Sequence, residues 1–467
     1  MAATLTLEER QQDRVFIGHP RGLAYLAFAE AWERFSYYGM QTLLVLYMVG
    51  QLLQPGHVGK VAGFAPFRRM IESATGPLSV QALASAIFGL YAGFVYLTPI
   101  AGGLVADRLL GKTRTVAAGA ILMAIGHFLM AFDVSFLIAL LCLLVGVGGF
   151  KGNIAAQVGE LYAPGDLRRA DAFQIYYIGI NAAVIVSPLI CGTLGEVYGW
   201  HYGFGAAGVG MVIGLAIYLS GRHWLPPDTR PLRGEPRAPR AALHRQDWKT
   251  ILVLVALVPV LAAASVGNMQ IFNAYLLWGR DSYDFLFMGF QLKTTWLVSL
   301  DAALSTACLI GTVAFWRWWA ARRPEPDEIT KIAIGTLISV GGLLALAFAS
   351  WLHARTGQRV SLAWAIAFHF INSVGFSNIF PVSLALYGRA APRAVAGTMI
   401  GVLYLFLFLA NLSVGWLGGL LDTWPGVSFW LLHAGIVTAA GLVFLLMRKA
   451  FGAVLAPRGE TEDAARG

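Results

Sequence analysis

The chain has 467 residues, of which 57% are hydrophobic and only 13% are charged, and it carries a formal net charge of +9. A soluble protein carries about 25% charged residues, so this deficit indicates a membrane protein whose outer surface faces lipid. The basic residues stand in short loops between apolar runs, as they do in the cytoplasmic loops of membrane proteins, and this argues against nucleic acid as a partner.

Apolar runs long enough to cross a bilayer follow one another along the chain, since a spanning helix needs about 20 such residues. The first six are predicted at 22–50, 78–105, 113–131, 134–158, 171–196 and 201–221. The second six are predicted at 249–278, 293–319, 331–352, 361–387, 396–421 and 427–448. The chain between the two sets is rich in proline and arginine and too polar to span a membrane. We therefore expect an all-α membrane protein with four parts: an N-terminal six-helix bundle (1–221), a cytoplasmic linker (222–248), a C-terminal six-helix bundle (249–450) and a disordered cytoplasmic tail (451–467).

Lysine and arginine are enriched in the loops that share a side of the membrane with the N-terminus. The residues that show this bias are Arg108, Lys112, Arg114, Arg168, Arg169, Arg317, Arg322, Arg323, Lys331, Arg389 and Arg393. The positive-inside rule places both termini in the cytoplasm. Because the N-terminal stretch lacks the apolar region of a signal peptide, we expect the first span to be retained.

The first span contains "EAWERFSYYG", residues 30–39, although a charge at mid-bilayer costs about 2.5–3.5 kcal/mol on insertion scales. On a helix, one face collects the polar side chains of this stretch, namely Glu30, Glu33, Arg34, Tyr37, Tyr38 and Gln41. Glu30 and Arg34 are i,i+4 neighbours and can pair, which leaves one carboxylate able to exchange a proton as its surroundings change. The alternative is a structural ion-pair cluster that packs the first helix.

Between the second and third spans, "GGLVADRLLGKTR" (102–114) resembles a loop motif of the major facilitator superfamily. In it, Asp107 and Arg108 can cap helix ends and pair with neighbouring helices. Six spans, a cytoplasmic linker and six more are also the architecture of that superfamily, in which two bundles rock about a central site. The resemblance implies a gating loop.

The fourth and fifth spans carry further polar residues. Lys151 lies in the apolar run "GVGGFKGNIAAQ" and needs a carboxylate partner, for which Glu30 or Glu33 is the candidate; the alternative is a lysine that reaches the cytoplasmic interface. In the fifth span, "FQIYYIGINAA" offers hydroxyl and amide groups for a polar cavity, although any one of them could serve helix packing alone.

These segments together resemble the proton-dependent oligopeptide transporters, the POT or PTR family of the major facilitator superfamily. The family signature ExxERFxYYG matches "EAWERFSYYG", and "YLTPIAGGLVADRLLG", "GFKGN" and "FQIYYIGINA" are similar to family blocks in the same order. The resemblance implies that Glu30, Glu33, Arg34 and Lys151 couple protons. It also implies that the binding cavity is lined by Arg34, Tyr37, Tyr38, Tyr96, Lys151 and Asn181.

The C-terminal half diverges from the family. The block "GNMQIFNAYLLW" supplies the candidate substrate-binding residues Gln270 and Asn273, but it has Met269 where the family usually has an acid. The tenth span has Phe376 at the position of a glutamate that faces the peptide amino terminus. We hypothesise that Asp301 in the eighth span replaces that acid as amine partner or second proton site. The alternative is a carboxylate hydrogen-bonded to the backbone or to the adjacent helix. Phe376 favours an aromatic, hydrophobic or N-modified ligand.

The sequence therefore predicts a proton-coupled symporter of the bacterial inner membrane that imports di- or tripeptides or peptide-like compounds. The alternatives are a divergent carrier of another organic anion or zwitterion, and a membrane receptor without turnover. We expect no enzymatic activity, because no nucleophile–base set or metal-ligand cluster is visible. The expected partners are the substrate, protons and the lipid bilayer, with a monomeric protein and no cofactor beyond the proton gradient.

Overall fold

The computed structural model describes residues 13–163, 165–228 and 243–456. Parts of the predicted linker (229–242) and of the predicted tail (457–467) lie outside the described residues. The chain divides into two units, which we call unit 1 (Met1–Glu235 with Phe285–Ala302) and unit 2 (Pro236–Asp284 with Ala303–Gly467). The predicted domain boundaries themselves stay a prediction.

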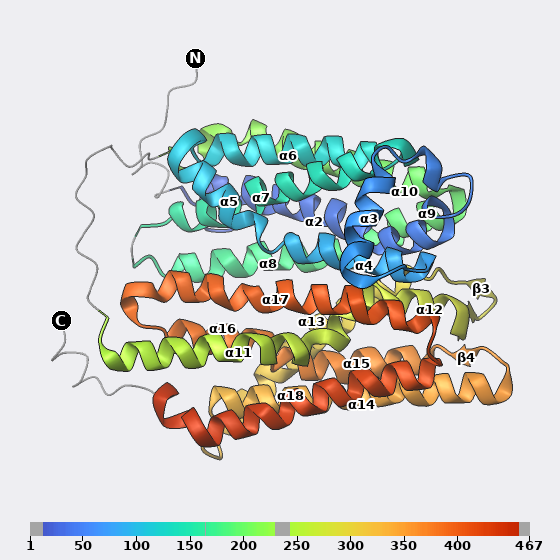
Figure 1. The fold of residues 1–467 in the computed structure, drawn as a ribbon. Coiled ribbons are helices and arrows are strands. Elements are labelled where there is room, and N and C mark those ends of the chain that lie inside the picture. The colour runs from blue at the N-terminus through green and yellow to red at the C-terminus, as the bar shows by residue number, and fades with distance from the viewer. Residues whose placement is uncertain (1–12, 164, 229–242, 457–467) are drawn as a thin grey trace. The chain divides into compact units, whose positions relative to one another are not determined.

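Unit 1 is built mainly of helices that lie side by side in Figure 1. Its α-helices are α2 (Arg21–Tyr47), α3 (Phe64–Thr75), α4 (Val80–Phe94), α5 (Thr98–Val105), α6 (Lys112–Leu129), α7 (Phe136–Glu160), α8 (Arg168–Ser187), α9 (Thr193–Tyr198) and α10 (Trp200–Ser220). The short strands β2 (Leu286–Phe287) and β3 (Phe290–Gln291) form an antiparallel pair. Helix α2 packs against α8 and α10, while α7 packs against α5 and α6.

Unit 2 has the same kind of construction. Its α-helices are α11 (Arg245–Met269), α12 (Ala274–Ser282), most of α13 (Trp296–Ala320), α14 (Glu328–Thr356), α15 (Ala363–Ser377), α16 (Phe380–Ala390), α17 (Ala396–Gly418) and α18 (Gly426–Leu455). Strands β1 (Tyr283–Asp284) and β4 (Val360–Ser361) pair in parallel. Helix α14 packs against α15 and α18, and α11 packs against α17 and α18.

The predicted spans correspond closely to helical segments. Within the described residues, ten helical segments are long and apolar enough to cross a membrane. The two other predicted spans, 22–50 and 113–131, correspond to α2 and α6, whose charged residues lower their hydropathy. The predicted twelve-span, all-α membrane architecture is thus matched element by element.

Three details differ from the sequence-based expectation. The predicted run 249–278 is interrupted at Gln270–Phe272, a 3₁₀ turn that separates α11 from α12. The predicted loop 51–77 contains the amphipathic helix α3, which a search for apolar runs passes over. Helix α18 continues to Leu455, so the first residues of the predicted tail are helical.

Breaks in three other spans coincide with prolines. Pro99 is the second residue of α5, Pro188 directly follows the end of α8, and Pro381 is the second residue of α16. Proline lacks an N–H donor and fits the first turn of a helix better than its interior. These residues therefore explain why single apolar runs are folded as two helical segments.

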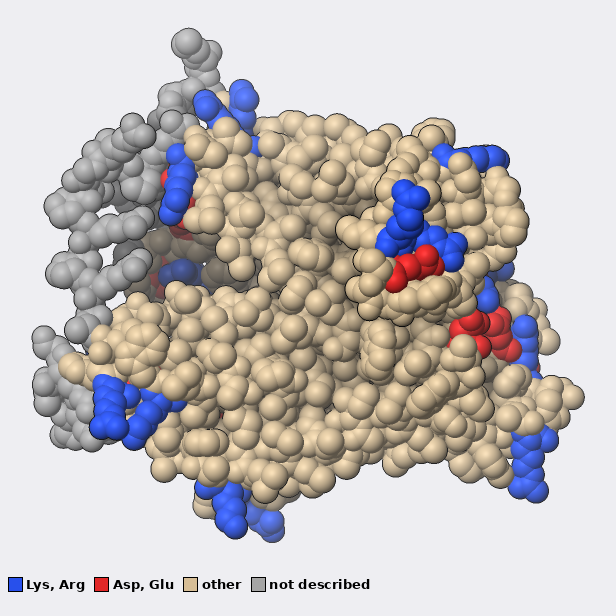
Figure 2. Space-filling view, in the orientation of Figure 1, with Lys and Arg blue, Asp and Glu red and all other residues tan. Residues whose placement is uncertain are grey.

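Charge and hydrophobicity are distributed as in a protein that crosses a bilayer. On the face shown in Figure 2, the coloured charged side chains lie mostly towards helix ends. Large apolar side chains are exposed between those ends, such as Ile178 and Ile310, each 68% exposed, and Leu446 at 65%. Apolar surface of this extent is unfavourable in water and is expected to face lipid.

Candidate functional site

The charged residues of α2 form a buried cluster. Glu30, Glu33 and Arg34 are 3%, 0% and 4% exposed. Arg34 Nε lies 3.1 Å from Glu30 Oε1 and 2.5 Å from Glu33 Oε2, so one guanidinium serves two carboxylates. These contacts are within ion-pair distance but lack hydrogen-bond angles. No described residue offers a hydrogen bond to Glu30 Oε2 or to either carboxylate oxygen of Glu33. The cluster therefore holds one acid more than Arg34 can neutralise.

The close packing of α2 on α8 fixes the position of this cluster. Ser187 Oγ donates a hydrogen bond of 2.5 Å to the carbonyl oxygen of Phe35. A Cβ at Gly39 would lie 2.7 Å from Cys191 Sγ, so only glycine fits at this approach. From α8, Tyr176 comes close enough to interact with Glu30. Two helices thus hold the acids in a site from which water is largely excluded.

Lys151 of α7 lies near the cluster without a direct ion pair. Its Nζ stands 4.7 Å from the ring centroid of Tyr96 in a cation–π contact. Electrostatic interaction reaches from Lys151 to Arg34, Glu33 and Glu30, but no described carboxylate lies within the 4.0 Å of an ion pair with it. The structure thus brings the predicted proton-coupling residues together. Lys151, stacked on the Tyr96 ring, is a second cation near Arg34.

The remaining N-terminal candidates lie on α2 and α8. Tyr37 is buried, and its ring centroid is 5.4 Å from Arg34 Cζ and 5.2 Å from the ring of Tyr38. Asn181 is half-buried, and its Nδ2 donates to the carbonyl oxygen of Tyr177 at 3.0 Å. Its amide oxygen has no hydrogen-bond partner among the described residues. The tyrosines therefore line the charged cluster directly, and Asn181 lies further along α8.

The predicted gating residues Asp107 and Arg108 are exposed, in a π-helical turn at Ala106–Leu110. Neither makes an ion pair with another described residue. Instead, Lys112 pairs with Glu160, and the carboxylate of Asp228 accepts hydrogen bonds from Thr113 N at 3.0 Å and Thr113 Oγ1 at 3.2 Å. Asp228 was not predicted, because its partner is 115 residues away and no local pattern marks it.

Two candidates of the C-terminal half are engaged inside unit 2. Gln270 and Asn273 are fully buried. Gln270 Nε2 lies 3.0 Å from His433 Nε2, and Asn273 Nδ2 donates to the carbonyl oxygen of Val414 at 3.2 Å. His433 was not predicted at this position, since a lone histidine in an apolar run carries no spacing signal.

Phe376 and Asp301 are both half-buried, on α15 and α13. The ring of Phe376 is stacked on that of Phe380, with 6.3 Å between centroids. Asp301 belongs to unit 1, together with the α2 cluster, whereas Phe376, Gln270 and Asn273 belong to unit 2. The predicted substrate-binding residues are therefore divided between the two units. Their roles stay predictions.

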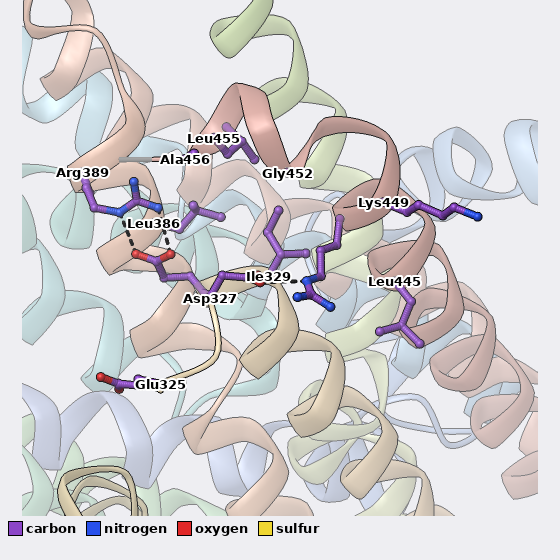
Figure 3. Close-up of a pocket in the computed structure, with 12 residues that line it drawn as sticks. Glu325, Asp327, Ile329, Leu386, Arg389, Leu445, Lys449, Gly452, Leu455 and Ala456 are labelled. Carbon is purple, nitrogen blue, oxygen red and sulfur yellow. Dashed lines mark hydrogen bonds and ion pairs between the residues drawn. The ribbon is translucent and has the colours of Figure 1, made fainter. Parts of the chain in front are cut away.

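A cavity of about 860 Å³ lies in unit 2 where α14 begins and α16 and α18 end, and none of the predicted site residues lines it (Figure 3). Arg389 donates two hydrogen bonds to Glu328, at 2.7 and 2.8 Å, and Arg448 donates to Asp327 at 2.7 Å. Partial burial acts to raise the pKa of Asp327, but hydrogen bonds from Thr330 and Arg448 outweigh it and hold that pKa below its ordinary value. This cavity is therefore an ion-paired junction of helix ends.

Comparison with known proteins shows which transporters the chain resembles. The POT family model matches residues 113–243, and known peptide transporters align with nearly the whole chain. The chain is therefore similar to transporters of the POT family. It is 29% identical to the peptide transporter YePEPT of Yersinia enterocolitica, over 93% of this chain and 95% of that protein. It is 27% identical to a di-/tripeptide transporter of Lactococcus lactis, over 94% and 97%.

Solved structures of POT transporters share the fold. A POT peptide transporter in complex with alafosfalin aligns with a TM-score of 0.80 at 24% identity, covering 97% of this chain and 100% of that one. A POT family transporter in complex with 5-aminolevulinic acid aligns with a TM-score of 0.79 at 21% identity, covering 95% and 99%. The predicted all-α membrane fold is confirmed, and the matched family model and relatives agree with the predicted resemblance to the POT family.

Proposed function

We propose that the protein is a proton-coupled symporter that imports di- or tripeptides or peptide-like compounds across the bacterial inner membrane. The observation that carries this proposal is the buried cluster of α2, in which Arg34 is shared between two carboxylates. A buried surplus carboxylate favours its protonated form, because burial disfavours charge. The peptide transporters among its relatives support the substrate class.

The geometry suggests how a proton could be coupled to substrate. Protonation of Glu33 or Glu30 removes one of the two charges that hold Arg34, so the guanidinium becomes available to a substrate carboxylate. Lys151, which is held by the Tyr96 ring rather than by an ion pair, offers a second cation to the same carboxylate. Loss of the proton on the inner side restores both ion pairs and weakens substrate binding.

The binding of the substrate's amino end is less constrained by the structure than the binding of its carboxylate. Gln270 and Asn273 already bond to His433 and Val414, and Phe376 stacks on Phe380. We infer that Asp301 is the partner of a substrate amine and that the ligand is more apolar than a generic dipeptide. The protein would act as a monomer in the bilayer, without a cofactor.

Proton-driven uptake by proteoliposomes tests the proposal. With an inward proton gradient, the wild-type protein should accumulate a labelled dipeptide, and accumulation should increase as the external pH falls. Glu33→Gln should abolish accumulation, since the residue can no longer release a proton. It should retain exchange of internal for external substrate, because exchange needs no net proton movement. Glu72→Gln is the matched control, since Glu72 lies in α3 and is paired with Arg68 outside the cluster.

Dipeptides with free and with blocked amino termini should be compared as substrates, both for the wild-type protein and for the Asp301→Asn variant. If Asp301→Asn transports free and blocked dipeptides equally well while the wild type prefers those with a free amino terminus, this supports Asp301 as the amine partner. Accumulation of a dipeptide by Glu33→Gln at the wild-type level would contradict the coupling role. Specific binding with no transport by wild-type protein would indicate a receptor, and transport confined to other organic anions would indicate a divergent carrier.

A further inference from the structure

A groove of about 600 Å³ lies within unit 2 between α13, α14 and α15. Its α13 side consists of residues that recur every three or four positions and so form one helical face, namely Leu304, Cys308, Gly311, Phe315 and Trp319. The opposite walls include Ile334 of α14 and Phe370 of α15. The volume is in the range of about 300–1,000 Å³ that ligand pockets in proteins occupy.

The groove is apolar and adjoins apolar surface. Phe315 and Phe370, which line it, are 46% and 52% exposed, and the neighbouring Ile310 is 68% exposed. Asn378 is a polar lining residue, but its Oδ1 already accepts a 2.6 Å hydrogen bond from Trp316 Nε1. A water molecule in this groove would find few hydrogen-bond partners, so the apolar walls are better matched to a hydrocarbon chain.

Cations stacked on tryptophans stand at the end of the groove. Arg323 Cζ lies 5.0 Å from the ring centroid of Trp319, and Lys331 Nζ lies 4.7 Å from that of Trp316. Both tryptophans line the groove. Next to them, Arg322 Cζ lies 4.8 Å from the ring of Trp318. Tryptophan and arginine side chains at the end of a spanning helix are typical of the membrane–water interface.

Two of these cations lack an acidic partner. Nearby acids are engaged elsewhere, since Glu325 pairs with Lys331, Asp327 with Arg448 and Glu328 with Arg389. Arg322 and Arg323 pair with no carboxylate among the described residues. Arg322 Nη1 donates to the carbonyl oxygen of Trp318 at 3.1 Å, so both guanidinium groups keep free donors. Guanidinium donors of this kind match the geometry of a phosphate.

We propose that the groove binds an anionic phospholipid of the surrounding bilayer, with an acyl chain against the apolar face of α13 and the phosphate on Arg322 and Arg323. The apolar wall runs along α13, and the unpaired arginines follow directly after its C-terminal end, which is the arrangement that an amphipathic lipid requires. The proposal concerns a lipid site outside the α2 cluster and does not depend on the transported substrate.

Native mass spectrometry of the purified full-length protein in detergent tests the headgroup part. Phosphatidylglycerol should bind more tightly than phosphatidylcholine of the same acyl chains. Replacing both arginines, Arg322→Gln with Arg323→Gln, should weaken phosphatidylglycerol binding by about thirtyfold, since each cation near a membrane surface contributes about a factor of five. Arg355→Gln is the matched control, because Arg355 stacks on Trp351 at 5.2 Å near the other end of α14, away from the groove. It should bind phosphatidylglycerol as the wild type does.

A second variant tests the groove. A Cβ at Gly311 would meet nothing within 4 Å, so Gly311→Leu can fill the groove without disturbing the fold. It should prevent phosphatidylglycerol binding, whereas Gly435→Leu, at an equally open position on α18, should not.

Three outcomes would overturn the proposal. They are equal affinity for the two lipids, unchanged binding in the double arginine variant, and unchanged binding in Gly311→Leu. Inorganic phosphate that competes fully with the lipid would show an anion site without a role for the groove, and would likewise overturn it.

Discussion

Arg34 lies between the carboxyl groups of Glu30 and Glu33 within α2, and Lys151 of α7 lies near them without touching the acids. Burial raises the free-energy cost of each unpaired charge, so removal of any one member leaves another uncompensated. At the same scale, glycines decide how closely the helices that carry these residues can approach. Position 102 is the tightest such approach in unit 1 that bears on α7.

Replacing Gly102 by alanine should destabilise the protein. A Cβ there would lie 1.8 Å from the carbonyl oxygen of Gly148, a backbone atom that cannot move without shifting α7. Overpacking of this kind costs about 1–3 kcal/mol. We expect Gly102→Ala to lower the melting temperature in detergent by several degrees. Gly103→Ala is the adjacent control, since a Cβ there meets nothing within 4 Å; an equal loss in both variants would contradict the packing argument.

At the scale of elements, the start of α6 depends on a residue outside its own sequence. The backbone at Gly111 has φ of +82°, and a Cβ there would come within 2.6 Å of Asp228 Oδ2. The carboxylate of Asp228 in turn accepts from Thr113 N, an otherwise unpaired donor of the first helical turn. A chain segment that follows α10 therefore caps α6.

Asp228→Ala should loosen the first turn of α6. Loss of a capping acceptor costs about 0.5–2 kcal/mol, of which the charge contributes only part. Amide hydrogen exchange at Thr113 should therefore become faster in Asp228→Ala and remain close to the wild-type rate in Asp228→Asn, which keeps an acceptor oxygen. Identical exchange rates in Asp228→Ala and wild type would show that the cap has no energetic role.

At the scale of the whole molecule, the spans and the charge pattern together describe a multi-pass membrane protein. Ten helical segments of the described chain meet the length and composition of a span, and α2 and α6 supply the others. Charged side chains on the visible face lie mostly towards helix ends, where water and lipid headgroups can solvate them (Figure 2). The bias of lysine and arginine among the loops then predicts which ends face the cytoplasm.

Fusion reporters test the orientation. Green fluorescent protein fused after Gly467 should fluoresce, whereas alkaline phosphatase fused there should be inactive, because it needs an oxidising compartment. Alkaline phosphatase inserted after Gly56 should be active, since the loop between α2 and α3 is predicted on the outer side. The reversed pattern of reporters would overturn the assignment of both termini to the cytoplasm.

Hydropathy and helical periodicity are local properties, and by themselves they determined the spans and the single polar face of Glu30, Glu33 and Arg34. Short sequence motifs carried the resemblance to the POT family. Tertiary structure alone decided which residues meet across long stretches of chain. Arg389 pairs with Glu328, 61 residues away in the sequence, and Asp228 bonds to Thr113, 115 residues away. Lys151 stacks on Tyr96 instead of forming the expected ion pair. The break at Gln270–Phe272 and the groove beside α13 likewise depend on packing between helices, which no local pattern of residues encodes.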